Sequence, residues 1–249
     1  MKQVFISGSI SLKKLPAEVR ASIDRIIKNG FNIIVGDAKG IDALVQQHCQ
    51  HSNYYQVTVY SIYSTPRTLI DRRFKTKEII PNTDAKRERE RQKEKDRAMS
   101  QDSDYSLVVW DGISAGSLSN ITRALTLGHK VKVFLSSKGE FLESTTVTSR
   151  NIERIYREHN GYSAAEVVTA LHETGKDYFK NTRAFNKKLL DLKVIEKVDN
   201  IYSPTAPYKH LLQIETYKGK AKGVRYRIEF IEWISEWITD NQTSQQKLL

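Results

Sequence analysis

The sequence has very little cysteine, since Cys49 is the only one in 249 residues. A single thiol cannot form an internal disulfide or a cysteine-rich zinc site, so we expect a reducing compartment. Apolar runs are also short, and none approaches the roughly 18 residues that a membrane-spanning helix needs. The first residues lead directly into a short apolar run, with no signal-peptide h-region. These absences predict a cytoplasmic protein without a membrane partner.

Histidine gives no metal-ligand pattern. His48 and His51 are three residues apart, with no carboxylate at the spacing of a metal-binding motif. Surface or core positions are the simpler interpretation of both. The sequence therefore predicts no metal site, and it contains no motif for a cofactor.

Positive charge is what the sequence has in excess. Lysine and arginine number 40 against 29 aspartates and glutamates, which gives a net charge of +11. Polyanions are the natural partners of such a chain. The densest run, residues 86–95, mixes both signs at helical spacing. We interpret this run as a solvent-exposed helix with ion pairs between residues four apart, in preference to the lining of a nucleic-acid groove.

Residues 1–138 alternate short apolar runs with helical patterns. The runs are at residues 4–6, 31–35, 56–60, 105–110 and 131–135. Continuous apolar strands separated by helices are typical of a parallel sheet covered on both faces. We therefore predict an α/β domain of the Rossmann-like, doubly wound type. Residues 61–100 interrupt the alternation and are interpreted as a charged insertion that forms a lid or a basic rim beside the site.

The composition turns polar at residues 139–150, which we interpret as a linker. Beyond it, helices are expected near residues 151–159, from a capping box at Ser163 onward, and at 182–192. Short strands are expected at residues 194–195, 211–214 and 224–228, then a helix at 230–238 and a tail from 241 to 249. A helix-turn-helix followed by a strand pair with a basic tip is the winged-helix order. Residues 151–240 are thus predicted to form a small winged helix-turn-helix domain.

Glycine and polar residues follow three of the predicted parallel strands. The carboxyl ends of such strands meet at one edge of the sheet, where ligands bind. Glycines let a phosphate approach the backbone, and a following helix N-terminus supplies N–H donors. We expect a nucleotide-type site formed by Gly8, Ser9, Gly36, Asp37, Lys39, Gly40, Asp42, Trp110, Asp111, Ser114, Gly116, Ser117 and Asn120.

These residue types have different expected roles. Ser114 and Ser117 can donate hydroxyl hydrogen bonds, and Lys39 adds a point charge. Aspartates would repel a phosphate, so they are assigned to ribose hydroxyls or to helix caps. Trp110 could stack on a base or pack in the core, and the sequence does not choose between these.

Three loops resemble those of a known superfamily. Residues 35–43, VGDAKGIDA, are similar to the glycine-rich signature of the DNA-processing proteins (DprA/Smf). Residues 111–120, DGISAGSLSN, resemble the phosphate-binding loop of LOG-type phosphoribohydrolases and of nucleoside 5′-phosphate N-glycosidases. Residues 6–10 resemble the first-strand loop of those glycosidases. Residues 3–135 thus resemble the SMF/DprA–LOG (SLOG) superfamily, which implies binding of a nucleotide, a nucleotide-derived signal or single-stranded DNA.

The sequence departs from the hydrolytic members at Asn120. Those enzymes carry a glutamate at the equivalent position, six residues after that of Ser114. An amide cannot act as a carboxylate nucleophile or base. A nucleoside 5′-phosphate N-glycosidase or deoxyribosyltransferase-like enzyme is therefore the alternative function. It would have to use Asp111, Asp37 or Asp42, and their spacing does not select one of them.

The predicted winged helix offers a second anion-binding surface, since wing lysines commonly contact phosphates. Its candidate nucleic-acid residues are Asn181, Thr182, Arg183, Asn186, Lys187, Lys218, Lys220, Lys222 and Arg225. The order of a Rossmann-like domain before a winged helix also resembles many DprA proteins. The leading hypothesis is a ligand-responsive regulator or DprA-like DNA-binding protein of phage or mobile-element type. A winged helix that docks a protein is the third possibility, and the sequence allows a homo-oligomer without determining the oligomeric state.

Overall fold

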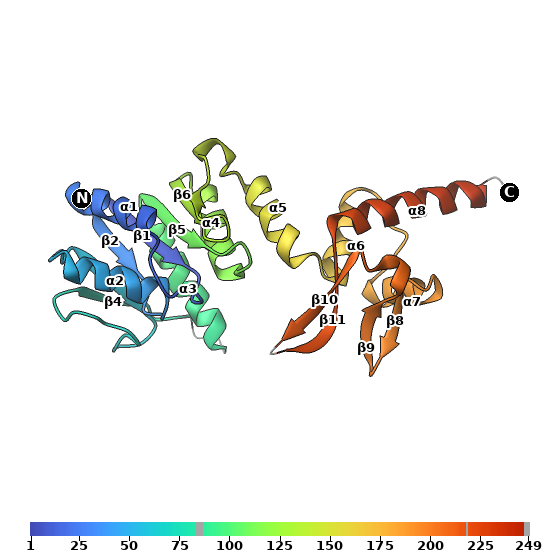
Figure 1. The fold of residues 1–249 in the computed structure, drawn as a ribbon, viewed down its shortest axis with the longest axis horizontal. Coiled ribbons are helices and arrows are strands. Elements are labelled where there is room, and N and C mark those ends of the chain that lie inside the picture. The colour runs from blue at the N-terminus through green and yellow to red at the C-terminus, as the bar shows by residue number, and fades with distance from the viewer. Residues whose placement is uncertain (83–86, 218, 247–249) are drawn as a thin grey trace. The chain divides into compact units, whose positions relative to one another are not determined.

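The computed structural model describes residues 1–82, 87–217 and 219–246, and the chain divides into two compact units between Glu153 and Arg154 (Figure 1). Each unit has its own cluster of buried apolar side chains. The two units are therefore described separately. None of the helices in the described residues has the length and apolar character needed to cross a bilayer.

The first unit is built on a seven-stranded sheet of described residues, in the order β4-β3-β2-β1-β5-β6-β7. The strands are β1 (Gln3–Gly8), β2 (Asn32–Val35), β3 (Val57–Ser61), β4 (Lys75–Glu78), β5 (Tyr105–Trp110), β6 (Lys130–Leu135) and β7 (Glu140–Phe141). All neighbours are parallel except β7, which is antiparallel to β6. The chain runs outward from β1 to β4 and then returns to place β5 beside β1. The strand order therefore reverses between β1 and β5.

Helices cover both faces of this sheet. They are α1 (Ala17–Lys28), α2 (Ile41–His51), α3 (Glu88–Gln101) and α4 (Ala115–Thr126). Successive strand side chains point to opposite faces, so Ile6 of β1 packs with Val19 of α1 while Phe5 packs with Met99 of α3. The predicted α/β class with a parallel sheet between helices is confirmed at this level.

Residues 61–100, expected to form an insertion, extend the sheet. β4 adds a strand beside β3, in register at Val59 and Thr76. All four β4 side chains are exposed, so this strand lacks the apolar run that marks the others. Helix α3 then returns the chain to β5 and buries Lys95, Met99 and Ser100. Although most residues of α3 are charged or polar, one face of this helix packs against the rest of the unit.

The second unit combines helices with two antiparallel hairpins. Its elements are α5 (Ser149–Asn160), which begins before the division, α6 (Ala164–Glu173), α7 (Thr182–Asp191), β8 (Ile195–Val198), β9 (Ile201–Pro204), the 3₁₀ turn η2 (Ala206–Tyr208), β10 (Leu212–Tyr217), β11 (Lys220–Tyr226) and α8 (Ile228–Gln246). Aromatic rings form the centre of its core. The ring centroid of Phe185 lies 5.4 Å from that of Tyr226 and 6.2 Å from that of Phe230. The capping box predicted at Ser163 is present, with the Glu166 N–H donating to Ser163 Oγ and the Ser163 N–H donating to Glu166 Oε2.

The hairpin that directly follows α7 is β8–β9, and the lysine-bearing hairpin β10–β11 comes later. A strand was expected at residues 194–195, but none at β9 (Ile201–Pro204), so the predicted strand pair corresponds to β10–β11 alone. Residues 139–150, expected to be a linker, contain β7, the 3₁₀ turn η1 (Ser144–Thr146) and the start of α5. Helix α8 continues to Gln246, through most of the expected tail. The assignment of a winged helix stays a prediction.

Candidate functional site

A cavity of about 430 Å³ lies at the carboxyl ends of β1 and β5. Its walls come from the loops after β1, β2, β3 and β5, the start of α2, the part of α3 from Gln92 to Met99 and the first two turns of α4. The strand order reverses between β1 and β5. Open α/β sheets bind ligands at this position, so this cavity is the candidate site of the first unit.

Three serine hydroxyls connect the β1 loop to the start of α4. Ser9 Oγ lies 2.9 Å from Ser114 Oγ, which donates to Ser117 Oγ at 2.9 Å. All three serines line the cavity, and Ser114 is the N-cap of α4. The first N–H groups of a helix have no partner within the helix and lie at the positive end of its dipole. This wall therefore carries donors suited to an anion.

Asp111 shapes the loop that precedes α4. Its Oδ1 accepts hydrogen bonds from the N–H groups of Ser114 at 2.8 Å and Ile113 at 3.1 Å. Burial raises the pKa of Asp111, but these backbone donors outweigh burial and hold the pKa below its usual value. The carboxylate is thus occupied within its own loop, as in an Asx turn.

Asp37 is fully buried and ionised beneath the cavity. Arg67 donates to it from Nη2 at 2.8 Å and from Nε at 3.2 Å, and Lys95 Nζ lies 3.1 Å from Oδ1. Ser61 Oγ adds a fourth bond at 2.9 Å. Burial raises the pKa of Asp37, but Arg67 and Lys95 outweigh burial and hold it far below its usual value. Asp37 therefore positions two cations that line the cavity.

Asp42 and Asp96 are the carboxyl groups of the cavity whose pKa is raised. Burial raises the pKa of Asp42 to about 6, despite the nearby charge of Lys95 and a hydrogen bond from the N–H of Ala38. Burial also raises the pKa of Asp96. Among Asp37, Asp42 and Asp111, the structure therefore singles out Asp42 as the group that gains and loses a proton near neutral pH.

Three predicted glycines are required by close contacts. A Cβ on Gly36 would collide with the Asp42 carboxylate, and a Cβ on Gly8 would overlap the carbonyl oxygen of Val109. Gly40 has φ of +78°, and a Cβ there would lie 2.6 Å from the carbonyl oxygen of Ile10. These glycines let the loops pack against each other. Gly116 differs, because it lines the cavity with open space around its Cα.

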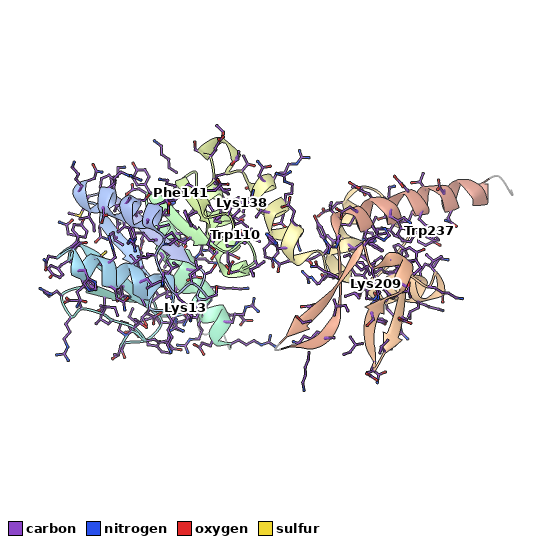
Figure 2. The ribbon with its side chains drawn as sticks, viewed as in Figure 1. Lys13, Trp110, Lys138, Phe141, Lys209 and Trp237 are labelled. Atoms are coloured by element: carbon purple, nitrogen blue, oxygen red, sulfur yellow. The ribbon has the colours of Figure 1, made fainter. Side chains whose placement is uncertain are left out.

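Five predicted ligand residues do not line the cavity, namely Gly36, Asp37 and Gly40, described above, and also Trp110 and Lys39. The side chain of Trp110 (labelled in Figure 2) is fully buried, and its Nε1 donates to the carbonyl of Ser114 at 3.1 Å. Trp110 therefore fixes the loop before α4 and is not placed to stack on a ligand. Lys39 is exposed on the loop after β2. Asn120 does line the cavity, where its Oδ1 accepts from Arg123 Nη1 at 3.0 Å.

The cavity contains polar atoms whose hydrogen bonds are unmade. Ser7 Oγ and Gln92 Nε2 are buried in its lining and find no partner among the described residues. An unmade buried hydrogen bond costs about 1–3 kcal/mol, so native structures rarely leave one without a function or a partner. These atoms favour a polar occupant of the cavity.

Comparison with protein-family models, with curated proteins and with solved structures finds no match to this chain. The resemblance to the SLOG superfamily therefore stays a prediction.

Several lining residues were not predicted from the sequence. Those from residues 61–100 with polar or charged side chains are Arg67, Gln92, Lys95 and Asp96. Lys95 and Asp96 stand inside or next to the charged run, where nothing in the local pattern distinguishes them from solvated residues. Arg67 reaches Asp37 across 30 residues of sequence. Only the packing of α3 against the sheet brings these groups together.

In the second unit, several predicted nucleic-acid residues have structural partners. Arg225 donates to the carbonyl oxygens of Asn160 at 2.9 Å and Gly161 at 3.2 Å, and lies 3.6 Å from Glu166. Asn181 caps α7 by accepting from the N–H of Ala184 at 3.0 Å. The polar atoms of these two side chains already make hydrogen bonds within the second unit. They are therefore poorly placed to contact a phosphate.

The other predicted residues divide by exposure. Arg183 and Lys187 are exposed one helical turn apart on α7, whereas Asn186 Oδ1 is buried and without a partner among the described residues. Thr182 is half-buried at the start of α7. The exposed basic residues of β11 are Lys220 and Lys222, and Lys218 lies outside the described residues. Figure 1 shows β8–β9 beside α7 and β10–β11 pointing away from it.

The raised pKa of Asp42 gives a testable pH dependence. At pH values between 3.8, the ordinary pKa of an aspartate, and about 6, the Asp42 carboxyl group is deprotonated in the unfolded chain but still protonated in the folded state. The buried Asp42 therefore lowers the free energy of unfolding as the pH rises through this range. In the Asp42→Asn variant, the side-chain amide oxygen can still accept the hydrogen bond from the N–H of Ala38. We expect the variant to match the parent near pH 4 and to exceed its free energy of unfolding by about 1–3 kcal/mol at pH 8.

Urea unfolding at pH 4, 6 and 8 measures this difference. Glu18→Gln, on the exposed side of α1, is the control and should show no such trend. A stability difference for Asp42→Asn that is the same at all three pH values would contradict the assignment.

Proposed function

We propose that the first unit binds a nucleotide or nucleotide-derived ligand in the cavity between β1 and β5, with its phosphate at the start of α4. The observation that carries this proposal is the chain of hydroxyls Ser9, Ser114 and Ser117 at the helix N-terminus. Hydroxyls and helix N–H groups donate to phosphate oxygens, and the helix dipole favours negative charge there. The volume of about 430 Å³ lies within the usual range for small-molecule sites.

The opposite wall suits the sugar of such a ligand. Asp42 and Asp96 would repel a phosphate when ionised but can accept hydrogen bonds from ribose hydroxyls. Asn120 adds an amide on the same lining, and the unpartnered Ser7 and Gln92 supply further polar contacts. The serine hydroxyls at the helix N-terminus, together with carboxylate and amide groups elsewhere in the lining, favour a ligand with an anionic end and a hydroxyl-bearing body.

The second unit carries the nucleic-acid part of the proposal. Lys220 and Lys222 are both exposed on β11, where Lys220 pairs with Tyr217 and Lys222 lies at an irregularity of the strand pairing. Exposed lysines and arginines bind phosphates of a nucleic-acid backbone without reading its sequence. We assign DNA to this surface. The protein is then a ligand-responsive DNA-binding regulator whose second unit acts as a winged helix.

Ser114→Ala tests the phosphate site. Ser114 bonds to both Ser9 and Ser117, so its loss removes a donor and releases the other two hydroxyls. We expect calorimetric titration with nucleoside mono- and diphosphates to show saturable binding to the parent, weakened about tenfold or more in the variant. Circular dichroism checks that the variant is folded.

Ser119→Ala on the same helix is the matched control. Ser119 is exposed, and its hydroxyl bonds to the carbonyl of Ala115 at 2.9 Å. It should bind nucleotides as the parent does. Absence of saturable binding by any of these nucleotides to the parent would refute the proposal, as would equal affinity in the two serine variants.

One observation favours the alternative N-glycosidase function. Asp42 lines the cavity with a pKa near 6, and a carboxyl group of this kind can donate a proton to a leaving base. Free base released from nucleoside monophosphates by the parent, and not by Asp42→Asn, would establish this function over binding alone. Base released equally by both proteins would exclude Asp42 as the acid.

A further inference from the structure

A second cavity, of about 510 Å³, lies at the other end of the strands in the first unit. It is bordered by the C-terminal half of α1, the amino ends of β1, β5 and β6, and residues 142–144. The connection from β5 to β6 runs through α4 on the opposite face of the sheet. On the face of the sheet that α1 covers, the described residues that lie over β5 and β6 are those at the edge of α1 and in the segment around β7. The cavity occupies the space between these two segments.

The floor of this cavity is apolar. Leu107 of β5 and Val4 of β1 point toward α1, in the same direction as Tyr105. The ring of Tyr105 stacks on that of Phe31 with a centroid distance of 5.9 Å and planes 3° apart. Leu142 closes one side. These surfaces suit a flat apolar body.

Cations gather at the rim of the same cavity. Arg25 Nη2 donates to Ser22 Oγ at 2.9 Å, and Lys132 Nζ donates to the same oxygen at 3.2 Å. Lys130 is a third basic residue in the lining. Burial, and to a smaller extent the charge of Arg25, lower the pKa of Lys132. No described lining residue is a carboxylate, and none of the three cations has an ion-pair partner among the described residues.

We propose that this cavity binds a small organic acid with a flat aromatic body, its carboxylate held between Arg25 and Lys132. A carboxylate there relieves the repulsion between the two cations and accepts charge-assisted hydrogen bonds from both. The aromatic body contacts Phe31, Tyr105 and Leu107. This site is separate from the nucleotide cavity and takes a different class of ligand.

Calorimetric titration with 2-naphthoate, and with the uncharged 2-naphthamide, tests the proposal. The acid should bind saturably and at least about tenfold more tightly than the amide, because only the acid meets the cation pair with a charge. Amide NMR shifts should appear at Leu107 and Lys132. Absence of saturation up to about 1 mM, equal affinity of acid and amide, or shifts centred on Ser114 would each overturn the proposal.

The double variant Arg25→Gln/Lys132→Gln removes the cation pair and should weaken 2-naphthoate binding about tenfold or more. The control Lys28→Gln/Lys138→Gln makes the same change in net charge at exposed residues away from the cavity. It should bind as the parent does. Equal affinity in the two double variants would overturn the assigned role of Arg25 and Lys132.

Discussion

Replacing Asp37 with asparagine is expected to lower the free energy of unfolding of the first unit by about 3–5 kcal/mol. The variant leaves Lys95, whose side chain is 4% exposed, without its counter-ion, and it also removes the bidentate acceptor of Arg67. Removal of one partner from a buried ion pair is costly because the remaining charge stays desolvated. Urea unfolding followed by circular dichroism measures the loss.

Glu88→Gln is the matched control for this prediction. Glu88 lies 3.8 Å from the same Arg67, but its side chain is 62% exposed, so its charge is already screened by water. It should change stability little. Lys95→Met in the Asp37→Asn background removes the stranded charge and should recover much of the loss. A change of less than about 1 kcal/mol in Asp37→Asn alone would contradict the role of the carboxylate as a buried anchor.

The pH dependence of this effect has a definite sign. The pKa of Asp37 is lowered in the folded state. The contribution of its ionised carboxylate to the free energy of unfolding is therefore fully present at pH values above 3.8, the ordinary pKa of an aspartate, and is lost as the pH falls through the pKa of the folded state. The difference between parent and Asp37→Asn should therefore be constant near neutral pH and shrink in strong acid. Asp42 has the opposite trend, which separates the two carboxyl groups experimentally.

The sheet and the edge that carries the candidate site could be predicted from the sequence because their signals are local. Runs such as residues 33–35 are apolar throughout because both faces of a parallel strand are buried. The glycines after β1 and β2 mark places where one loop backbone meets another. Both signals lie within a few residues of the feature they indicate.

The rest of the site could not be predicted, because it depends on contacts between distant residues. Lys95 meets Asp37 across 58 positions of sequence, inside a helix whose composition looks solvated. Strand β4 has no buried side chain and so no strand pattern. Two candidate residues have side chains directed away from the predicted sites: Trp110 faces the core, and Arg225 faces the end of α5. Side-chain direction follows from register and packing, which spacing alone does not give.

The double charge reversal Lys220→Glu/Lys222→Glu is expected to weaken DNA binding about 10- to 100-fold at 0.1 M salt. Each lysine that contacts a phosphate releases a counter-ion on binding, so loss of two contacts should also lower the salt slope by about 2. Fluorescence anisotropy with labelled single- and double-stranded DNA at several salt concentrations measures both quantities. The parent should bind at least one of the two forms.

A matched control separates a local contact from the effect of net charge. Lys13→Glu/Lys14→Glu makes the same change in net charge at two exposed residues of the first unit. If the hairpin lysines contact DNA, the control keeps most of the parent affinity and its full salt slope, because distant charges are screened within about 10 Å. An equal loss in both variants would mean that net charge alone attracts DNA. Absence of DNA binding by the parent would leave the hairpin to a protein partner and would remove the nucleic-acid half of the proposed function.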